Sequence, residues 1–393
     1  MDDMDSQRIT VGLLWGKYPG PVTTVNDLAL TLDPARFRFV FLYLSDDGGQ
    51  DNHWTRLGHP VVFLSSIPRL NAFRPSILIR LIRAIRREKI DILHCHAHKP
   101  TFYGALAGWL CPRLRILGHV HGLNRSSSFN RKLTNWFLFR RINRILPVAE
   151  AVKRDLLASN WTLAESKITV LENSIDFDRF AGERTLPDQV RRIMTLPEGS
   201  FVFGTVGRLE MTKGIRYLVD AFAIVHREFP KTQLILLGDG RFRGEYEKQV
   251  CDLGLSDCVR FLGFQPNIPQ LLRGLDVFVM ASVAEGMPRG ILEAMAAGVP
   301  CVATRVGGIP EILGDGRFGI LAEPADPHSL ADAMRTLVRM KGQDRLQLAE
   351  AARSHTRDVY SHTVVREKLR AIYEAEFDPI RNRNVQSPSN EDL

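Results

Sequence analysis

Short apolar runs of four to eight residues alternate with helical patterns along most of the chain. In the first half they occupy 9–15, 37–44, 61–64, 91–96, 115–119, 144–148 and 167–171, and each predicts a buried strand. In the second half they occupy 201–206, 233–237, 259–262, 275–280 and 300–304. Many of the segments between them, such as 76–89, 130–144 and 215–228, carry apolar residues at helical spacing. This alternation predicts parallel βαβ units and an α/β protein.

A chain of 393 residues is too long for one ordinary domain. The polar segment 181–198 contains Gly182, Pro187 and Pro197, and we place a linker there. The predicted parts are an N-terminal domain at 1–182, a C-terminal domain at 183–360, a C-terminal helix at 361–378 and a disordered polar tail at 379–393.

Composition narrows the class of protein. A hydrophobic content of 45% with 24% charged residues is typical of a globular protein, and no apolar run approaches the ~18 residues of a membrane-spanning helix. The acidic N-terminus does not resemble a signal peptide. The five cysteines are scattered and form no C-x2-C motif, which favours a cytoplasmic protein with free thiols over a zinc protein.

The positive charge is concentrated in one region. Residues 69–144 hold 16 Lys and Arg against two acids, a local balance of +14 within a net charge of +8, so the remainder sums to −6. The predicted helices 76–89 and 130–144 combine these cations with apolar residues. We expect an anionic membrane surface as a partner and, since no nucleic-acid-binding motif accompanies the charge, no nucleic acid.

The stretch 275–300 predicts a buried strand, a tight loop with Gly286 and Pro288, and a helix that stops at Gly298. In an open α/β sheet, ligands bind beyond the carboxyl ends of the strands. Glu285 begins this loop and Glu293 follows eight residues later in the helix, so both carboxylates can face one crevice.

The sequence E-G-M-P-R-G-I-L-E at 285–293 resembles the E-x7-E element of retaining glycosyltransferases of family 4. The resemblance implies the GT-B fold, in which two Rossmann-like domains face each other across a cleft and the C-terminal helix crosses back to the N-terminal domain. It assigns the ribose of a nucleotide sugar to Glu293 and the donor sugar to Glu285. A carboxylate that accepts two hydroxyl hydrogen bonds suits this role.

Other segments extend the resemblance. V-G-R-L-E-M-T-K-G at 206–214 places Arg208 and Lys213 where the family grips the donor diphosphate, and two fixed cations would stabilise its developing charge. Gly307-Gly308 would let the backbone approach an anion. The remaining donor contacts implied by the resemblance are Gly286, Met287, Pro288, Phe264 near the base, and Gly20, which stands where the family usually has paired glycines.

A histidine completes the site that the resemblance implies. H-V-H-G at 119–122 is similar to the family's loop that presents a histidine to the donor sugar, and His121 is the better match. We therefore predict His121, Glu285, Arg208 and Lys213 as the catalytic group. His94, His96 and His98 alternate as metal ligands can, but no acids or cysteine pair accompany them, so we expect no metal and no other cofactor.

We predict a retaining, metal-independent glycosyltransferase. It would move a sugar from a UDP-, GDP- or ADP-linked donor to a glycan or lipid-linked acceptor. The resemblance implies bacterial surface-polysaccharide or lipopolysaccharide synthesis, at the inner face of the cytoplasmic membrane. Two alternatives remain open: a non-catalytic, membrane-docked scaffold that binds nucleotide sugar or glycan, and a nucleotide-sugar epimerase of the same architecture.

Overall fold

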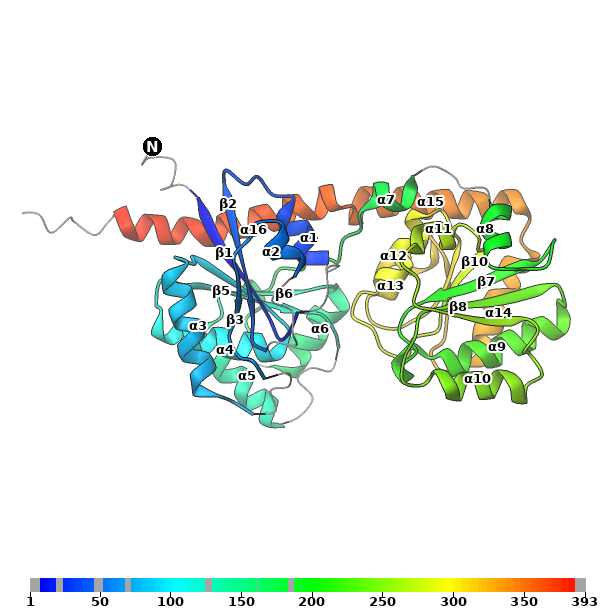
Figure 1. Cartoon of the computed structure of the whole chain (residues 1–393), viewed down its shortest axis with the longest axis horizontal. Coiled ribbons are helices and arrows are strands. Elements are labelled where there is room, and N and C mark those ends of the chain that lie inside the picture. Colours follow the sequence, from blue (N-terminus) through cyan, green and yellow to red (C-terminus); the bar gives the residue numbers. More distant parts are fainter. Residues whose placement is uncertain are drawn as a thin grey trace, which may run out of the picture. The chain divides into compact units, whose positions relative to one another are not determined.

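The chain forms two compact α/β units (Figure 1). The computed structural model describes residues 8–18, 24–45, 52–67, 72–123, 129–160, 162–182 and 187–385, so Gly20 lies outside the described residues. The first unit comprises Met1–Glu172 together with Thr363–Leu393, and the second comprises Asn173–His362. No helix in the described ranges combines the length and apolar character needed to cross a bilayer.

The first unit is built on a six-stranded parallel sheet in the order β3-β2-β1-β4-β5-β6. Its strands are β1 (Ile9–Trp15), β2 (Phe37–Tyr43), β3 (Val61–Phe63), β4 (Ile92–His96), β5 (Arg115–Val120) and β6 (Arg144–Pro147). Its helices are α1 (Thr24–Leu30), α2 (His53–Arg56), α3 (Pro75–Arg87), α4 (His98–Leu110), α5 (Phe129–Arg141) and α6 (Glu150–Ser159). The central strands β1 and β2 consist almost wholly of buried apolar residues, as expected for a sheet covered on both faces.

The second unit repeats this plan, with the sheet order β12-β11-β10-β7-β8-β9. Its strands are β7 (Phe201–Val206), β8 (Thr232–Leu237), β9 (Val259–Gly263), β10 (Val277–Met280), β11 (Cys301–Thr304) and β12 (Ile320–Ala322). Its helices are α7 (Phe177–Ala181), α8 (Pro187–Ile193), α9 (Ile215–Glu228), α10 (Arg243–Asp252), α11 (Ile268–Leu272), α12 (Arg289–Ala296), α13 (Ile309–Ile312), α14 (Pro327–Arg339) and α15 (Gly342–Tyr360). In both units the order reverses beside the first strand, between β1 and β4 and between β7 and β10. Ligands of such sheets bind at this switch point.

The last helix, α16 (His362–Val385), packs on the first unit. Its Glu376 is buried and accepts from Arg115 at 2.5 Å and from Arg144 at 2.7 Å. Tyr373 of the same helix is fully buried and contacts His94. The predicted return of the C-terminal helix and the two-domain α/β fold are therefore confirmed.

The helix α16 extends further than the sequence predicted. It continues through Pro379 to Val385, whereas we expected a disordered tail from residue 379. A proline removes one helical hydrogen bond and crowds the preceding turn, but it does not have to end the helix. Residues 386–393 lie outside the described ranges.

The predicted strand at 167–171 does not form. The segment lies along β6, where Thr169 and Leu171 donate their N–H groups to the carbonyls of Ile145 and Pro147. Only the Ile145–Ile168 bridge is made. Pro147 has no N–H to return, which is one reason the ladder stays incomplete.

The units divide after Glu172, ten residues before the boundary placed at 182. The residues after this division belong to the second unit because its arginines bind them: Arg273 donates to Phe180 O at 2.9 Å and Arg353 to Ala181 O at 3.1 Å. The segment expected to be a linker also contains α8, whose Arg191 pairs with Asp276 at 2.7 Å.

Candidate active site

In the second unit, the loops that follow β7, β10 and β11 are locked together through their backbones. The N–H of Val283, after β10, donates to Thr212 O, after β7. The N–H of Gly308, after β11, donates to Gly286 O at 2.7 Å. Three loops from neighbouring strands therefore hold one another in place at the switch point of this sheet.

Two glycines make this contact possible. Gly214 has φ +64°, and a Cβ built on it would lie 1.9 Å from the carbonyl oxygen of Ala281. Gly307 has φ +55°, and its Cβ would lie 2.0 Å from the carbonyl oxygen of Glu285. Any side chain at either position would push the loops apart.

The locked loops bring Lys213 and Glu285 together. Lys213 Nζ lies 2.6 Å from Glu285 Oε1, and Ser282 Oγ donates to the same oxygen at 2.7 Å. Thr304 fixes the backbone beneath them by donating to Ser282 O at 2.5 Å. Ser282 and Thr304 were not predicted, although Ser282 stands only three residues before Glu285 in the sequence.

Glu293 lies in α12 and is largely withdrawn from water, with 15% of its side chain exposed. Burial raises the pKa of its carboxyl, while the cations of Arg289 and Arg179 act in the opposite direction. Arg289 Nε is 3.9 Å away, too far for a hydrogen bond. A carboxylate held in this way gains from any ligand that donates hydrogen bonds to it.

The other residues predicted to bind the donor take different environments. Arg208 is exposed, and the Phe264 side chain is 82% exposed. Gly286, Met287 and Pro288 are buried. The Met287 carbonyl accepts from Asn173 Nδ2 at 2.7 Å, a support that the sequence did not indicate.

The first unit carries four histidines at the ends of β4 and β5. His94 Nε2 and His119 Nδ1 are 3.1 Å apart, and His96 Nδ1 and His121 Nε2 are 3.3 Å apart. The interplanar angle is 10° in the first pair and 23° in the second. One pair lies over the other, with ring centroids 4.3 Å apart both for His94–His96, which are tilted by 30°, and for His119–His121, which are stacked. Trp15 at the end of β1 covers His96, with ring centroids 3.9 Å apart and planes 5° from parallel.

The members of this histidine cluster differ in exposure. His94, His96 and His119 are at most 1% exposed, whereas His121 is partly exposed. Burial lowers the pKa of His94 to about 3 and those of His96 and His119 well below their usual value, with a charge on His121 acting in the same direction. Three of the four rings are therefore neutral at physiological pH.

The cluster also meets the distance criterion for a metal site, since ligand nitrogens of His94, His96 and His119 lie within 4.8 Å of one another. An imidazole binds a metal along a lone pair in the plane of its ring. The rings of His94 and His96 lie one over the other, with centroids 4.3 Å apart and planes tilted by 30°, so an ion in the plane of one ring would lie out of the plane of the other. This arrangement favours hydrogen-bonded pairs over a shared ion, and the expectation of no metal remains a prediction.

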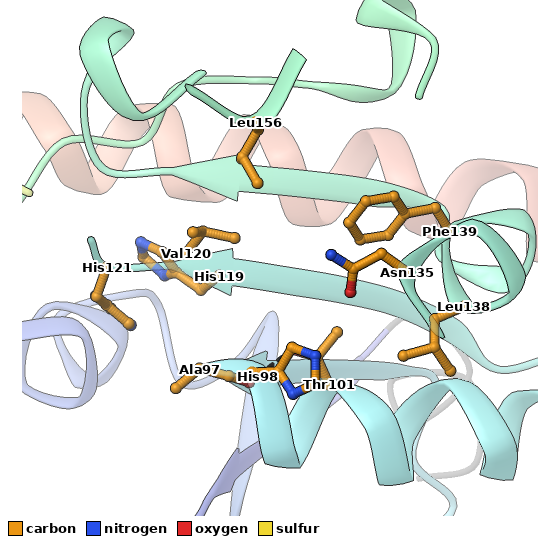
Figure 2. Close-up of a pocket in the computed structure, with 10 residues that line it drawn as sticks. All are labelled: Ala97, His98, Thr101, His119, Val120, His121, Asn135, Leu138, Phe139 and Leu156. Carbon is orange, nitrogen blue, oxygen red and sulfur yellow. Dashed lines mark hydrogen bonds between the residues drawn. The ribbon is translucent and has the colours of Figure 1, made fainter. Parts of the chain in front are cut away.

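A small cavity of about 50 Å³ adjoins His119 and His121 (Figure 2). Leu138 and Phe139 of α5 line it, as does Leu156 of α6. Sites for drug-sized ligands are roughly 300–1,000 Å³, so this cavity has room for only a small apolar group.

Comparison with known proteins identifies both halves of the chain. Residues 19–179 match the family model described as Glycosyltransferase Family 4, and residues 200–340 match that of Glycosyl transferases group 1. The D-inositol 3-phosphate glycosyltransferase of Corynebacterium jeikeium is 34% identical over 348 residues, which cover 82% of this chain and 80% of that protein. The UDP-Gal:alpha-D-GlcNAc-diphosphoundecaprenol alpha-1,3-galactosyltransferase of Escherichia coli is 30% identical over 267 residues, 65% of this chain and 68% of that one.

A solved structure supports the fold. The crystal structure of Anabaena HepE in complex with UDP superposes with a TM-score of 0.81 at 22% identity and covers 93% of this chain and 100% of that one. With the sequence relatives, this match shows that the chain belongs to the family 4 glycosyltransferases, enzymes of the GT-B fold that act on nucleotide sugars.

Proposed function

We propose that the protein transfers a hexose from a nucleotide sugar to a lipid-linked or glycan acceptor, with retention of anomeric configuration and without a metal ion. The observation that carries the proposal is the Lys213–Glu285 pair, fixed by locked loops at the switch point of the second sheet. Glu293 would accept the ribose hydroxyls and Phe264 would lie near the base. His121 would contact the donor sugar or the acceptor.

The chemistry of the cations supports a mechanism without a metal. Departure of a nucleoside diphosphate leaves negative charge on its phosphates, and prearranged cations lower the cost of that charge. Arg208 and Lys213 can supply this stabilisation. Lys213 is paired with Glu285 in the free protein, so an arriving diphosphate would share the ammonium with that carboxylate.

A UDP-sugar is the first donor to test. The similar Anabaena HepE was crystallised in complex with UDP, and the similar Escherichia coli enzyme is named as a UDP-Gal galactosyltransferase. Purified protein should be screened by thermal shift against UDP-, GDP- and ADP-sugars, because a bound ligand raises stability by mass action. Turnover with the best donor and a lipid-linked acceptor, followed by NMR of the product, then tests retention. An inverted linkage would contradict the proposed stereochemistry, and loss of activity with EDTA would contradict the metal-free mechanism.

The two alternatives left by the sequence make different predictions. The relatives are transferases, which argues against a non-catalytic scaffold. A pure binder would release no sugar from the donor. An epimerase would consume the donor with no acceptor present, whereas the transferase should require an acceptor for rapid turnover.

We also propose that an exposed surface on α4 and α5 rests on an anionic membrane. This aromatic surface is formed by Trp109, Leu110, Leu133, Trp136 and Phe137, which are 38–58% exposed. Trp109 and Phe137 stack with centroids 5.5 Å apart, so the two helices present one continuous apolar area. Exposed cations border it, and the Arg140 guanidinium lies 3.7 Å over the Trp136 ring. Aromatic rings beside cations are typical of a surface at the headgroup level.

The structure corrects two parts of the membrane interpretation. Arg141 points inward and donates to Gly108 O at 2.7 Å and Leu114 O at 2.8 Å, while Arg144 pairs with Glu376. Neither residue is available to lipid. In α3, the apolar residues Ile77, Leu81 and Ile85 are buried, so that helix offers its exposed arginines and a single well-exposed apolar side chain, Ile79 at 49%.

Sedimentation with liposomes tests the aromatic surface. Binding should rise with the fraction of anionic lipid and weaken with salt. Changing Arg131, Lys132 and Arg140 together to Gln should weaken it by ~1 kcal/mol per lost cation. Changing the exposed Arg227, Arg357 and Arg370 of the second unit and α16 to Gln removes the same charge elsewhere and should have little effect. Protein that stays in the supernatant at low salt would contradict the membrane proposal.

A further inference from the structure

The hydrogen bond between His96 and His121 has a donor and an acceptor, and the surroundings of His96 indicate which residue is the donor. Each neutral imidazole has one N–H donor and one bare acceptor nitrogen. Either His96 donates from Nδ1 to His121 Nε2, or His121 donates from Nε2 to His96 Nδ1. The 3.3 Å distance between the two nitrogens fits both arrangements.

The other nitrogen of His96 distinguishes the two. His96 Nε2 is buried and has no hydrogen-bond partner among the residues that the structure describes. If His121 were the donor, His96 would carry its proton on Nε2, as a buried N–H without an acceptor. Such N–H groups are rarer in folded proteins than acceptors that lack a donor. The surroundings therefore favour His96 as the donor, with its proton on Nδ1.

The neighbouring rings hold His96 in the orientation that this hydrogen bond needs. The Trp15 ring stacks on His96, and the His94 ring packs against it at a centroid distance of 4.3 Å with a tilt of 30°. His94 is held in turn by Tyr373, whose hydroxyl lies 2.8 Å from His94 Nδ1. The cluster thus reaches from the core of the first unit to the partly exposed ring of His121.

We propose that His96 is a positioning residue that fixes the ring and the tautomer of His121, so that His121 meets its substrate as a neutral hydrogen-bond donor through Nδ1. This inference rests on the proposed role of His121 at the donor sugar or acceptor. With Nε2 occupied as an acceptor, the proton of His121 is on Nδ1, from which it can be donated to a hydroxyl oxygen. Protonation of His121 on Nε2 is opposed because His96 would then have to move its own proton to the unpaired Nε2.

Two amide substitutions separate this role from a simple packing role. The amide nitrogen of asparagine is as far from Cβ as His Nδ1, and that of glutamine is one bond farther, as His Nε2 is. His96→Asn can therefore keep the donor to His121, whereas His96→Gln displaces it. Both remove the stacked ring, so they form a matched pair.

The experiment combines activity with ¹⁵N NMR of histidine-labelled full-length protein, in which the shifts of the two ring nitrogens report the tautomer. We expect Nδ1–H and a bare Nε2 for His121 in the wild type and in His96→Asn. Sugar transfer should stay within ~3-fold in His96→Asn and fall ~10-fold in His96→Gln, about the effect of one hydrogen bond. Nucleoside diphosphate affinity, measured in parallel, reports that the variants are folded.

Several outcomes would overturn the proposal. They are a proton on Nε2 of His121, a doubly protonated His121 at neutral pH, or equal transfer rates in folded Asn and Gln variants. If the wild type transfers no sugar at all, the proposed function fails, and the NMR spectrum still decides the tautomer.

Discussion

The two units share one sheet order but hold their candidate residues by different means. In the second unit, Gly214 and Gly307 let neighbouring loops touch through their backbones, and Lys213 and Glu285 are placed by that contact. In the first unit, stacked and hydrogen-bonded side chains place His121. The main-chain shape therefore limits substitution in the second unit, whereas the chemistry of each side chain limits it in the first.

The largest effect is expected where the backbone positions a charge. Lys213→Ala should lower kcat by ~10²-fold or more, because the developing charge of the diphosphate loses a prearranged cation. Lys248→Ala is a matched control, since Lys248 is exposed and pairs with Asp252 on its own helix. Steady-state kinetics with a saturating donor measure both. A near-normal kcat for Lys213→Ala would remove this residue from the mechanism.

A glycine pair tests whether the loop contact itself matters. Gly307→Ala and Gly254→Ala both place a side chain at positive φ, but a Cβ at Gly254 meets nothing within 4 Å. The strain common to both is about 1–2 kcal/mol. Only Gly307→Ala should also displace Glu285 and weaken nucleotide-sugar binding, by ~10-fold or more. Calorimetric titration with the nucleotide sugar compares the affinities of the two variants. Equal affinities would show that the loop contact is dispensable for binding.

The same difference explains which features the sequence could predict. The strands could be predicted because they are apolar runs. Lys213, Glu285 and Glu293 could be predicted because a site shaped by the main chain requires glycines and charged residues at a fixed spacing in the sequence. The orientation of a charged residue was not visible. Arg141 and Arg140 are neighbours in a basic helix, yet Arg141 binds buried carbonyls and Arg140 is exposed.

The pairing of the histidines could not be predicted either. His96 and His121 are 25 residues apart, and their contact depends on the register in which β4 pairs with β5. The ring of Trp15 reaches them from β1. Such contacts arise from tertiary packing, which one sequence does not specify residue by residue.

Glu293 should show opposite effects on stability and binding. Burial raises the pKa of its carboxyl in the folded protein above the unfolded pKa near 4.5. As the pH rises through these two pKa values, the buried carboxyl ionises and the folded protein loses stability. Glu293→Gln should therefore be more stable than the wild type at neutral pH, by about 0.5–1 kcal/mol, and the gain should shrink toward pH 4.5.

Glu293→Gln should also bind the nucleotide sugar about tenfold less tightly, because a charge-assisted contact is lost. Urea unfolding and calorimetric titration measure the two effects. Glu247→Gln, at an exposed site paired with Arg243, should change neither. A less stable Glu293→Gln would mean that the carboxylate has partners that stabilise it in the free protein.

The smallest effect is expected at the buried end of the histidine cluster, where Tyr373 contacts His94. Burial raises the pKa of Tyr373, so its phenol stays protonated and can donate to His94 Nδ1 at 2.8 Å. Tyr373→Phe keeps the ring packing of α16 and removes only this hydrogen bond, at a cost of about 1 kcal/mol. If such side-chain contacts organise the first unit but not the second, the amides of β4 and β5 should exchange hydrogen faster in Tyr373→Phe than in the wild type. The amides of β7 and β8 should keep their protection. Equal loss of protection in both sheets would show that the hydroxyl supports the whole chain, and the contrast between the two units would then not extend to their stability.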